Sequence, residues 1–208
     1  MAYTPKQVFL NGIWLDNPIY RQVLGICSTL AVTNLLANTI FMCFGLIFTT
    51  ALSNLTISLL RDYTPKRIRM IVQVLIIASY VMIVDIIIKA LAPDIHRFIG
   101  PYVGLIITNC IIMGRAEAFA SQNKPLLSLY DGIASGMGYS LVLILIASVR
   151  EPLGFGTILG MALPARDVWW HSWIIMVMPP GAFFMLGMFT WFARQWLVKG
   201  SKTVRRMP

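Results

Sequence analysis

The sequence predicts an all-α integral membrane protein whose helices divide into two halves. Hydrophobic residues make up 58% of the chain and charged residues only 12%, and the mean hydropathy of +0.75 is outside the range of soluble globular domains. Apolar stretches of about 20 residues, enough to span a bilayer, alternate with charged or Pro/Gly-rich joints. We expect six transmembrane helices, arranged as two inverted three-helix repeats with short or broken first and fourth helices.

The chain is expected to form a single membrane domain, residues 1–208. Its predicted parts are a cytoplasmic tail (1–20), a first three-helix repeat (21–92), a second three-helix repeat (93–198) and a basic cytoplasmic tail (199–208). The N-terminal segment lacks an apolar core followed by a small-residue cleavage site, so we expect the first span itself to direct membrane insertion.

The first half begins with a span that is short and unusually polar. Residues 23–38 contain Ser, Thr, Cys and Asn side chains, and the second span, 39–60, follows with almost no joint. The first helix is therefore expected to be broken or to cross only part of the membrane, because non-helical backbone is tolerated there only inside protein or along a cavity. A basic joint, in which Pro65 stops the helix, precedes the third span, 68–91.

The fourth span, 99–120, carries a polar group of three residues in its apolar middle. Thr108, Asn109 and Cys110 follow one another there. Polar side chains in hydrocarbon cost free energy unless they find partners, so these residues are expected to point inward, toward protein or a buried group.

The last two spans are predicted at 126–149 and 173–198. Gly132 and Gly136 permit close helix contact near the start of the fifth span. The joint that follows begins at Arg150 and ends in a tryptophan-rich segment, 169–173, typical of a membrane interface.

Lysine and arginine residues set the expected orientation. With the N-terminus in the cytoplasm, only Arg97, Arg150 and Arg166 fall in outer loops. The inner side collects Lys6, Arg21, Arg61, Lys66, Arg67, Arg69, Lys124, Arg194, Lys199, Lys202, Arg205 and Arg206. This bias predicts that both termini are cytoplasmic. The net charge of +9 lies between spans and on the tail, so it does not indicate nucleic-acid binding.

The two halves share a polar signature. Residues 25–34 and 104–110 each contain one glycine, one cysteine and one Thr-Asn pair. With three spans per half, a repeat would have inverted topology and would bring Cys27 and Cys110 face to face near the midplane. The alternative is chance recurrence of short polar runs.

The cysteines suggest several roles. Cys27, Cys43 and Cys110 all lie in apolar stretches, where a cysteine most often packs as a small hydrophobe. A disulfide, a metal-binding thiolate pair and simple helix packing remain open for Cys27 and Cys110. A two-iron cluster needs four ligands, so this chain could supply half. Thr33, Thr108 and Asn109 could then donate hydrogen bonds to the sulfurs.

Three stretches resemble a known family of membrane subunits. They are Leu24-Gly-Ile-Cys-Ser-Thr-Leu-Ala-Val-Thr33, Leu105-Ile-Ile-Thr-Asn-Cys-Ile-Ile-Met-Gly-Arg-Ala-Glu-Ala-Phe-Ala120 and Tyr130-Asp-Gly-Ile-Ala-Ser-Gly-Met-Gly-Tyr139. The family comprises the D-type subunits (NqrD) of the Na⁺-translocating NADH:quinone reductase and the E-type subunits (RnfE) of the Rnf complex, an ion-pumping ferredoxin:NAD oxidoreductase. The resemblance covers residues 17–194. Ser28 after the first cysteine favours the quinone reductase, since the Rnf protein tends to have proline there.

The resemblance implies a role in electron transfer. Family members of the quinone-reductase type pair with a homologous, oppositely oriented E-type subunit (NqrE) in a six-subunit complex of the bacterial inner membrane. Each of the two contributes two cysteines to one [2Fe-2S] cluster, which carries electrons across the membrane between flavins, coupled to Na⁺ export. Carried onto this sequence, the ligands are Cys27 and Cys110, and Cys43 is a packing residue. Flavins and NADH belong to partner subunits, and the chain has no nucleotide fingerprint of its own, so it is part of an enzyme but not catalytic alone.

Intramembrane charges are candidates for the cation path. Asp85 and Asp131 are carboxylates within predicted spans. Lys89, four residues after Asp85, could instead neutralise it, and Asp131 could instead cap its helix. Arg115 and Glu117 either anchor the end of the fourth helix or bias the potential of the cluster.

Two other classes of protein compete with this interpretation. A secondary transporter built on an inverted repeat would bind its substrate at the broken helices and would tolerate serine at Cys27 and Cys110. A structural assembly protein would tolerate apolar replacements there as well.

Overall fold

A computed structural model describes residues 24–65, 67–91, 93–158, 161–162 and 177–204. Among these residues the regular secondary structure is helical apart from β1 (Thr157–Ile158) and β2 (Met161–Ala162), which form one antiparallel pair. The predicted tail 1–20 and the tryptophan-rich segment 169–173 lie outside the described residues.

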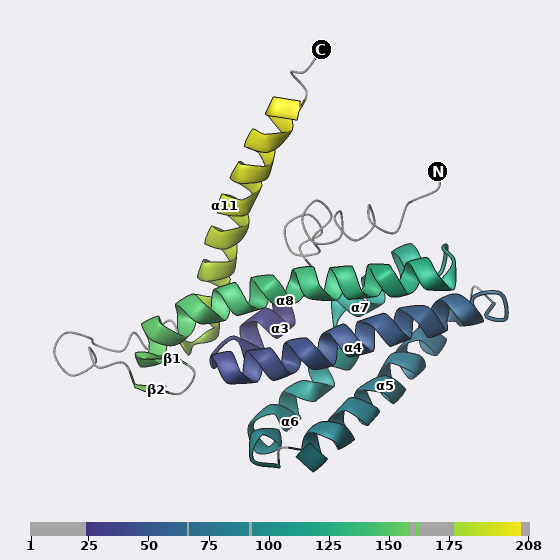
Figure 1. The fold of residues 1–208 in the computed structure, drawn as a ribbon, viewed down its shortest axis with the longest axis horizontal. Helices are drawn as coiled ribbons and strands as arrows, with labels where there is room; N and C mark the ends of the chain where they lie inside the picture. The colour runs from purple at the N-terminus through teal and green to yellow at the C-terminus, as the bar shows by residue number, and fades with distance from the viewer. Residues whose placement is uncertain (1–23, 66, 92, 159–160, 163–176, 205–208) are drawn as a thin grey trace.

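Figure 1 shows the helices in their order along the chain. They are α3 (Ile26–Val32), α4 (Leu36–Leu60), α5 (Arg69–Leu91), α6 (Pro93–Ile107), α7 (Cys110–Arg115), the π-helical turn η2 (Ala116–Ala120), α8 (Pro125–Phe155) and α11 (Pro179–Val204). Within the described part, four stretches are long and apolar enough to cross a membrane: 36–60, 69–91, 100–120 and 125–155. The protein is therefore helical and suited to a membrane, as predicted.

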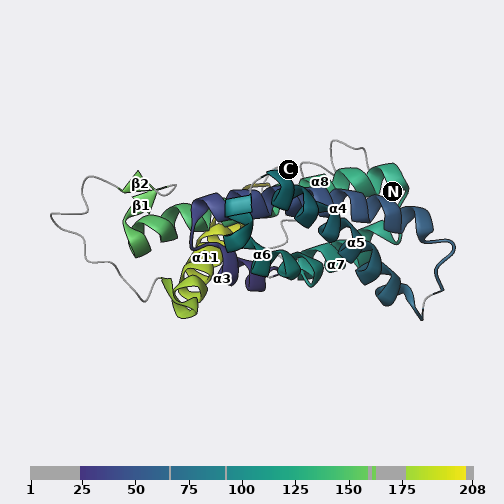
Figure 2. The same cartoon turned by 90° about the horizontal axis from the view of Figure 1, so that it is seen from below.

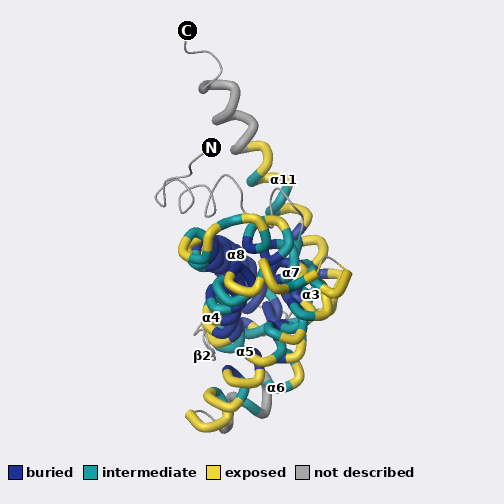
Figure 3. The backbone as a smooth tube through the Cα atoms, turned by 90° about the vertical axis from the view of Figure 1, so that its right-hand side faces the viewer, coloured by how far each residue is buried: buried dark blue, intermediate teal, exposed yellow. Residues whose placement is uncertain are grey.

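Helices α4 and α8 lie side by side and form the centre of the molecule (Figures 1 and 2). Glycine makes their close approach possible. A Cβ added at Gly132 would stand 2.9 Å from the carbonyl oxygen of Thr50, and one added at Gly136 would stand 3.2 Å from the Cα of Ile47. The predicted close contact at these two glycines is confirmed, and buried residues gather in this region of the tube in Figure 3.

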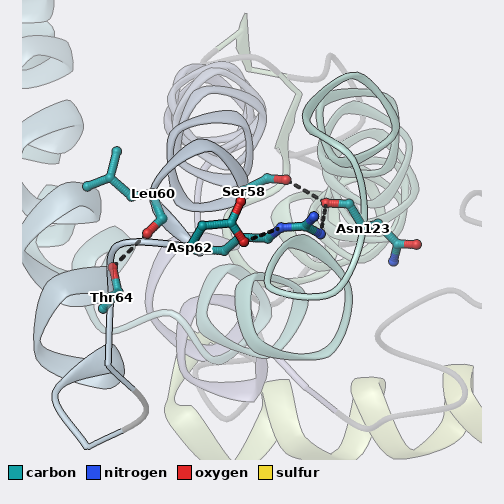
Figure 4. A network of polar contacts seen from close by, with 6 residues as sticks. Ser58, Leu60, Asp62, Thr64 and Asn123 are labelled. Carbon is teal, nitrogen blue, oxygen red and sulfur yellow. Dashed lines mark hydrogen bonds and ion pairs between the residues drawn. The ribbon is translucent and has the colours of Figure 1, made fainter.

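The end of α4 is tied to the loop that leads into α8, as Figure 4 shows. Ser58 Oγ and Arg61 Nη1 both donate to the carbonyl oxygen of Asn123, at 2.6 and 3.2 Å. Thr64 Oγ1 donates back to the carbonyl oxygen of Leu60 at 2.9 Å. The first two bonds hold the end of α4 against the loop that precedes α8, and the third closes the turn after α4 back onto its last residue.

The first and fourth predicted spans are both interrupted, as expected. Helix α3 has 7 residues and ends at Val32, and the chain turns before α4 begins at Leu36. Helix α6 ends at Ile107, and after a break at Thr108 and Asn109 the chain resumes as α7. Residues 24–38 therefore contribute a short half-helix and the start of α4, not a complete span.

Helix α8 is longer than predicted, and this corrects the assignment of Arg150 to an outer loop. The helix continues to Phe155, and Arg150 and Glu151 are buried within it. A charged pair normally signals the end of a span. Here both side chains are bonded to the ends of neighbouring elements, so burial does not leave them unsatisfied.

Helix α11 begins at Pro179, within the predicted sixth span, and continues to Val204, into the predicted basic tail. Its first turns bury Ala182, Met185 and Leu186, next to α3 and α8. The helix then leaves the bundle at a steep angle (Figure 1), and most of its described length is exposed (Figure 3).

Candidate functional site

Cys27 and Cys110 occupy equivalent positions at the starts of two half-helices. Cys27 is the second residue of α3, after the N-cap Gly25, and Cys110 is the first residue of α7, after the N-cap Asn109. Backbone N–H groups in a first helical turn have no partner within the helix. Both thiols therefore stand beside amide donors.

A hydrogen bond joins the two half-helices next to these cysteines. Asn109 Nδ2 donates to Ser28 Oγ at 3.2 Å, although the two residues are 81 positions apart in the chain. Asn109 Oδ1 also accepts from the backbone N–H of Ile111 at 3.1 Å, which caps α7. Because Ser28 follows Cys27 and Asn109 precedes Cys110, this bond brings the cysteine-bearing ends together.

Tyr139 of α8 also contacts the junction, by which we mean the region where the starts of α3 and α7 meet. Its side chain is fully buried, and its hydroxyl donates to the carbonyl oxygen of Gly25 at 3.0 Å and forms a short hydrogen bond with Ser28 Oγ. Gly25 has a φ of 86°, a conformation that favours glycine. A Cβ there would stand 2.6 Å from Tyr139 Cε2 and 2.8 Å from Ile111 Cδ1.

The three cysteines differ in exposure, and all are free thiols. Cys43 is buried and its Sγ donates to the carbonyl oxygen of Ser140 at 3.8 Å, so its predicted packing role is confirmed. Cys27 is partly exposed, and Cys110 and Thr108 are exposed. The expectation that the run of three polar residues points inward holds for Asn109 alone. Cys110 and Thr108 face the surface of this chain, where a partner could meet them.

Thr33 lies at the other end of α3 from Cys27. Its hydroxyl donates to the carbonyl oxygen of Thr29 at 2.5 Å and accepts from Arg150 Nη1 at 2.7 Å. The second guanidinium nitrogen of Arg150 donates to the carbonyl oxygens of Val177 and Met178, at 2.8 and 3.1 Å. Arg150 thus joins the C-terminal end of α3 to the segment that leads into α11.

Glu151 contacts the other side of the interruption between α3 and α4. Its Oε2 accepts from the backbone N–H of Leu36 at 2.7 Å, where α4 begins. A cationic side chain near the end of α3 and an anionic one at the start of α4 both match the helix dipoles. Neighbouring residues of α8 therefore stabilise the two sides of the interruption between α3 and α4.

The two candidate carboxylates of the cation path have partners. Asp85 Oδ1 lies 2.9 Å from His96 Nε2. Its partner therefore comes from α6, whereas the sequence spacing suggests Lys89. Asp131 is buried and forms a bidentate ion pair with Arg115, whose Nε donates to Oδ2 at 3.0 Å. The alternative that Asp131 caps its helix is wrong, because the N-cap of α8 is Lys124.

Arg115 and Glu117 anchor the end of the α7 segment, as predicted. Arg115 reaches α8 through Asp131. Glu117 accepts from Arg69 and, at 2.9 Å, from Gln73 Nε2, both on α5. The segment that follows Cys110 is therefore held between α5 and α8.

Sequence reasoning missed the side chains that organise the junction. Tyr139 and Ser28 lie in the stretches that resemble the family, but no structural role is predicted for them. Arg150 is predicted to lie in a loop. One signal was available for Tyr139, since a tyrosine in an apolar span needs a partner for its hydroxyl. The identity of that partner depends on which helices meet, which local sequence does not reveal.

The described part of the chain contains no group of three or more His, Cys, Asp or Glu side chains that could hold a metal ion by itself. The candidate ligands are thus a pair of thiols, and a four-ligand centre would need the remainder from another protein.

Comparison with known proteins identifies the family. Residues 5–190 match the family of Rnf-Nqr subunits, described as membrane proteins. The chain belongs to this Rnf-Nqr family. Relatives named as the D subunits of Na(+)-translocating NADH-quinone reductases are 46% identical to it. They include the protein of Pseudomonas aeruginosa, aligned over 93% of this chain and 88% of its own length, and that of Pasteurella multocida, aligned over 91% and 92%. The resemblance that the sequence motifs indicated is thereby confirmed, and this Rnf-Nqr protein is similar to quinone-reductase subunits along nearly its whole length.

Proposed function

We propose that this Rnf-Nqr protein is the D subunit of a Na⁺-translocating NADH:quinone reductase in a bacterial inner membrane. In this proposal Cys27 and Cys110 supply two of the four ligands of a [2Fe-2S] cluster, and the homologous E-type subunit supplies the other two. The cluster would act as a one-electron carrier between flavins on partner subunits, within a six-subunit complex. The chain is then part of an oxidoreductase without being catalytic alone.

The observation that carries the proposal is the hydrogen bond between Ser28 and Asn109. It adjoins both cysteines, although they lie in different halves of the chain, and neither thiol is buried as Cys43 is. The Thr108 hydroxyl beside Cys110 is exposed, and a polar group at membrane depth is costly unless another protein covers it. A half-ligated centre completed by a partner accounts for both features.

The donor chemistry also fits a two-iron cluster. Free thiols are the ligands that such clusters require. Apart from the Ile111 N–H, which is bonded to Asn109, the first-turn amides of α3 and α7 offer hydrogen bonds that favour anionic sulfur. Asn109 is bonded to Ser28 and to the backbone of Ile111, so its role in this proposal is to orient the start of α7. Thr108 is exposed beside Cys110 and could donate from the partner side, whereas Thr33 is bonded at the far end of α3.

The two cysteine-bearing helix starts support an inverted-repeat arrangement of the two halves, although the interruption follows Cys27 in the first half and precedes Cys110 in the second. Helix α3 opens the first half and the pair α6 and α7 opens the second, and each opening element carries its cysteine directly after a helix start. An odd number of spans per half would place these starts on opposite sides of the midplane, pointing toward each other. Both termini would then lie in the cytoplasm.

Asp85 and Asp131 remain candidates for the Na⁺ path in this proposal. Each is already paired, with His96 and Arg115 respectively, so a passing cation would have to compete with a resident partner. Asp85→Asn and Asp131→Asn should raise the Na⁺ concentration needed for half-maximal quinone reductase activity of the complex. Asp62→Asn, on an exposed loop residue, is the control that should leave it unchanged.

The decisive experiment is electron paramagnetic resonance with iron quantitation on the purified complex. Wild type should show a reduced two-iron signal, which Cys27→Ser and Cys110→Ser each abolish while the complex stays assembled. Cys43→Ser is the matched control and should keep the signal, because that thiol is a packing group.

Other outcomes would contradict the assignment of Cys27 and Cys110 as cluster ligands. If no iron copurifies with wild type, or if both serine variants retain the signal, the cysteines are not cluster ligands. Full activity of the serine variants would then favour a transporter, whose broken helices bind substrate without thiolates, and tolerance of apolar replacements would favour a structural assembly protein.

A further inference from the structure

We propose that the Tyr139 hydroxyl sets the relative placement of the Cys27 and Cys110 thiols, as a positioning residue that acts through Ser28 and Asn109. The inference rests on the proposed function in one respect, since paired thiols matter to this protein as cluster ligands. It adds a residue of α8 to a site otherwise built from α3 and α7.

Tyr139 is linked by hydrogen bonds to both half-helices, directly to α3 and through Ser28 to α7. Its hydroxyl bonds to the carbonyl oxygen of Gly25, the N-cap of α3, and to Ser28 Oγ. Ser28 in turn accepts from Asn109, the N-cap of α7. A continuous chain of hydrogen bonds therefore runs from α8 through the start of α3 to the start of α7.

The ring of Tyr139 lies in an apolar core, and only its hydroxyl meets polar groups. Tyr139 belongs to the apolar core with Ile111, Val142 and Leu143, and its side chain has no exposed surface. A phenylalanine would fill almost the same volume, so the hydroxyl contributes hydrogen bonds and little packing. Its partners fix which way the start of α3 faces.

Loss of that hydroxyl would loosen one specific contact. Ser28 Oγ would retain only the carbonyl oxygen of Gly25, at 3.3 Å, and Asn109. The carbonyl of Gly25 would still accept from Thr29 Oγ1 at 2.9 Å. The start of α3 would then lose its hydrogen bonds to α8, while Arg150 would still hold the other end of the helix through Thr33. The Cys27 thiol, which lies at the released end, would sample a wider range of separations from Cys110.

The first test measures this separation directly in the full chain. In a Cys43→Ser background, a short rigid dimaleimide can link only Cys27 and Cys110 within one molecule, and mass spectrometry counts the linked product. We expect efficient linking in this background, and a yield at least several-fold lower with Tyr139→Phe. Tyr130→Phe changes an exposed tyrosine on the same helix and should keep the parental yield.

A second variant distinguishes positioning from general damage. Ser28→Ala removes the same connection from the α3 side and should reduce the yield to a similar degree. The double variant Ser28→Ala/Tyr139→Phe should show little further loss, because residues that act through one network are not additive. Equal yields for Tyr139→Phe and Tyr130→Phe, additive losses in the double variant, or failure of the parental protein to link would each overturn the proposal.

The second test uses the assembled complex and separates this inference from the proposed function. With Tyr139→Phe the reduced iron signal should be broadened or shifted in its g-values, whereas Tyr130→Phe should match wild type. A wild-type complex that has no iron signal would overturn the cluster assignment alone, and the linking yields would still decide the role of Tyr139. A Tyr139→Phe spectrum identical to wild type would count against the positioning role.

Discussion

Among the glycines of the described residues, Gly25 is the one at which an added Cβ would come closest to another atom. Its φ of 86° and the contacts that a Cβ would make with Tyr139 and Ile111 act together. Gly25→Ala should reduce the free energy of unfolding by about 2 kcal/mol or more, from left-handed strain and from displacement of the tyrosine ring. Thermal unfolding of the purified chain in detergent measures this.

Gly104 provides the matched control for that substitution. A Cβ added there meets no atom within 4 Å, and the residue lies within helix α6. Gly104→Ala in the isolated chain should be neutral or slightly stabilising, by up to about 1 kcal/mol, because alanine is the better helix former. Similar losses for both substitutions would show that the left-handed turn at Gly25 does not constrain the fold.

The ion pair between Arg115 and Asp131 should respond strongly to loss of one partner. Both side chains are buried, so Asp131→Leu or Arg115→Met alone leaves an uncompensated charge and should cost about 3–5 kcal/mol. The double variant Arg115→Met/Asp131→Leu should recover much of that loss. Unfolding temperatures of the four proteins form a double-mutant cycle, and additive effects would contradict a direct pairing.

At the scale of elements, Arg150 and Glu151 stabilise the interruption between α3 and α4. Glu151→Ala removes the acceptor for the Leu36 N–H and should cost about 1–3 kcal/mol. Hydrogen–deuterium exchange should rise in peptides that cover residues 26–40. Val149→Ala, at an exposed position on the same helix, should leave that exchange unchanged, and equal exchange in the two variants would contradict the role given to Glu151.

The breaks in the helices could be predicted from sequence, but their supports could not. Thr108 and Asn109 in an apolar span, and the short polar stretch before α4, are local signals of interrupted helices. The partners of those interruptions come from α8, more than 100 positions away for Leu36 and Glu151. The sequence favours a loop at Arg150 because a charge within a span is costly, and only the tertiary contacts show how that cost is met.

The candidate site was predictable to a similar extent. Cys27 and Cys110 emerged from the repeated polar signature and the family resemblance. The network around them did not, because Ser28, Asn109 and Tyr139 become neighbours only after three helices pack. Local sequence determines which residues are polar within a span, while the partner of each depends on helix packing.

At the scale of the whole molecule, the bias of the basic residues predicts its orientation. Asp62 and Phe155 are exposed residues at opposite ends of the α4 and α8 pair. In a chain without native cysteines, Asp62→Cys should react with a membrane-impermeant maleimide only in inverted vesicles. Phe155→Cys should react only in right-side-out spheroplasts. The reverse pattern would place both termini outside and contradict the positive-inside assignment.

The contacts of Glu151 and Arg150 also bear on the order in which the protein is made. The ribosome releases α3 and α4 long before α8, so for most of synthesis the Leu36 amide lacks Glu151 and the Thr33 hydroxyl lacks its Arg150 donor. The first cysteine-bearing segment should therefore reach its final form only after α8 has entered the membrane. Loading of any metal centre at Cys27 would then follow the synthesis of the second half of the chain.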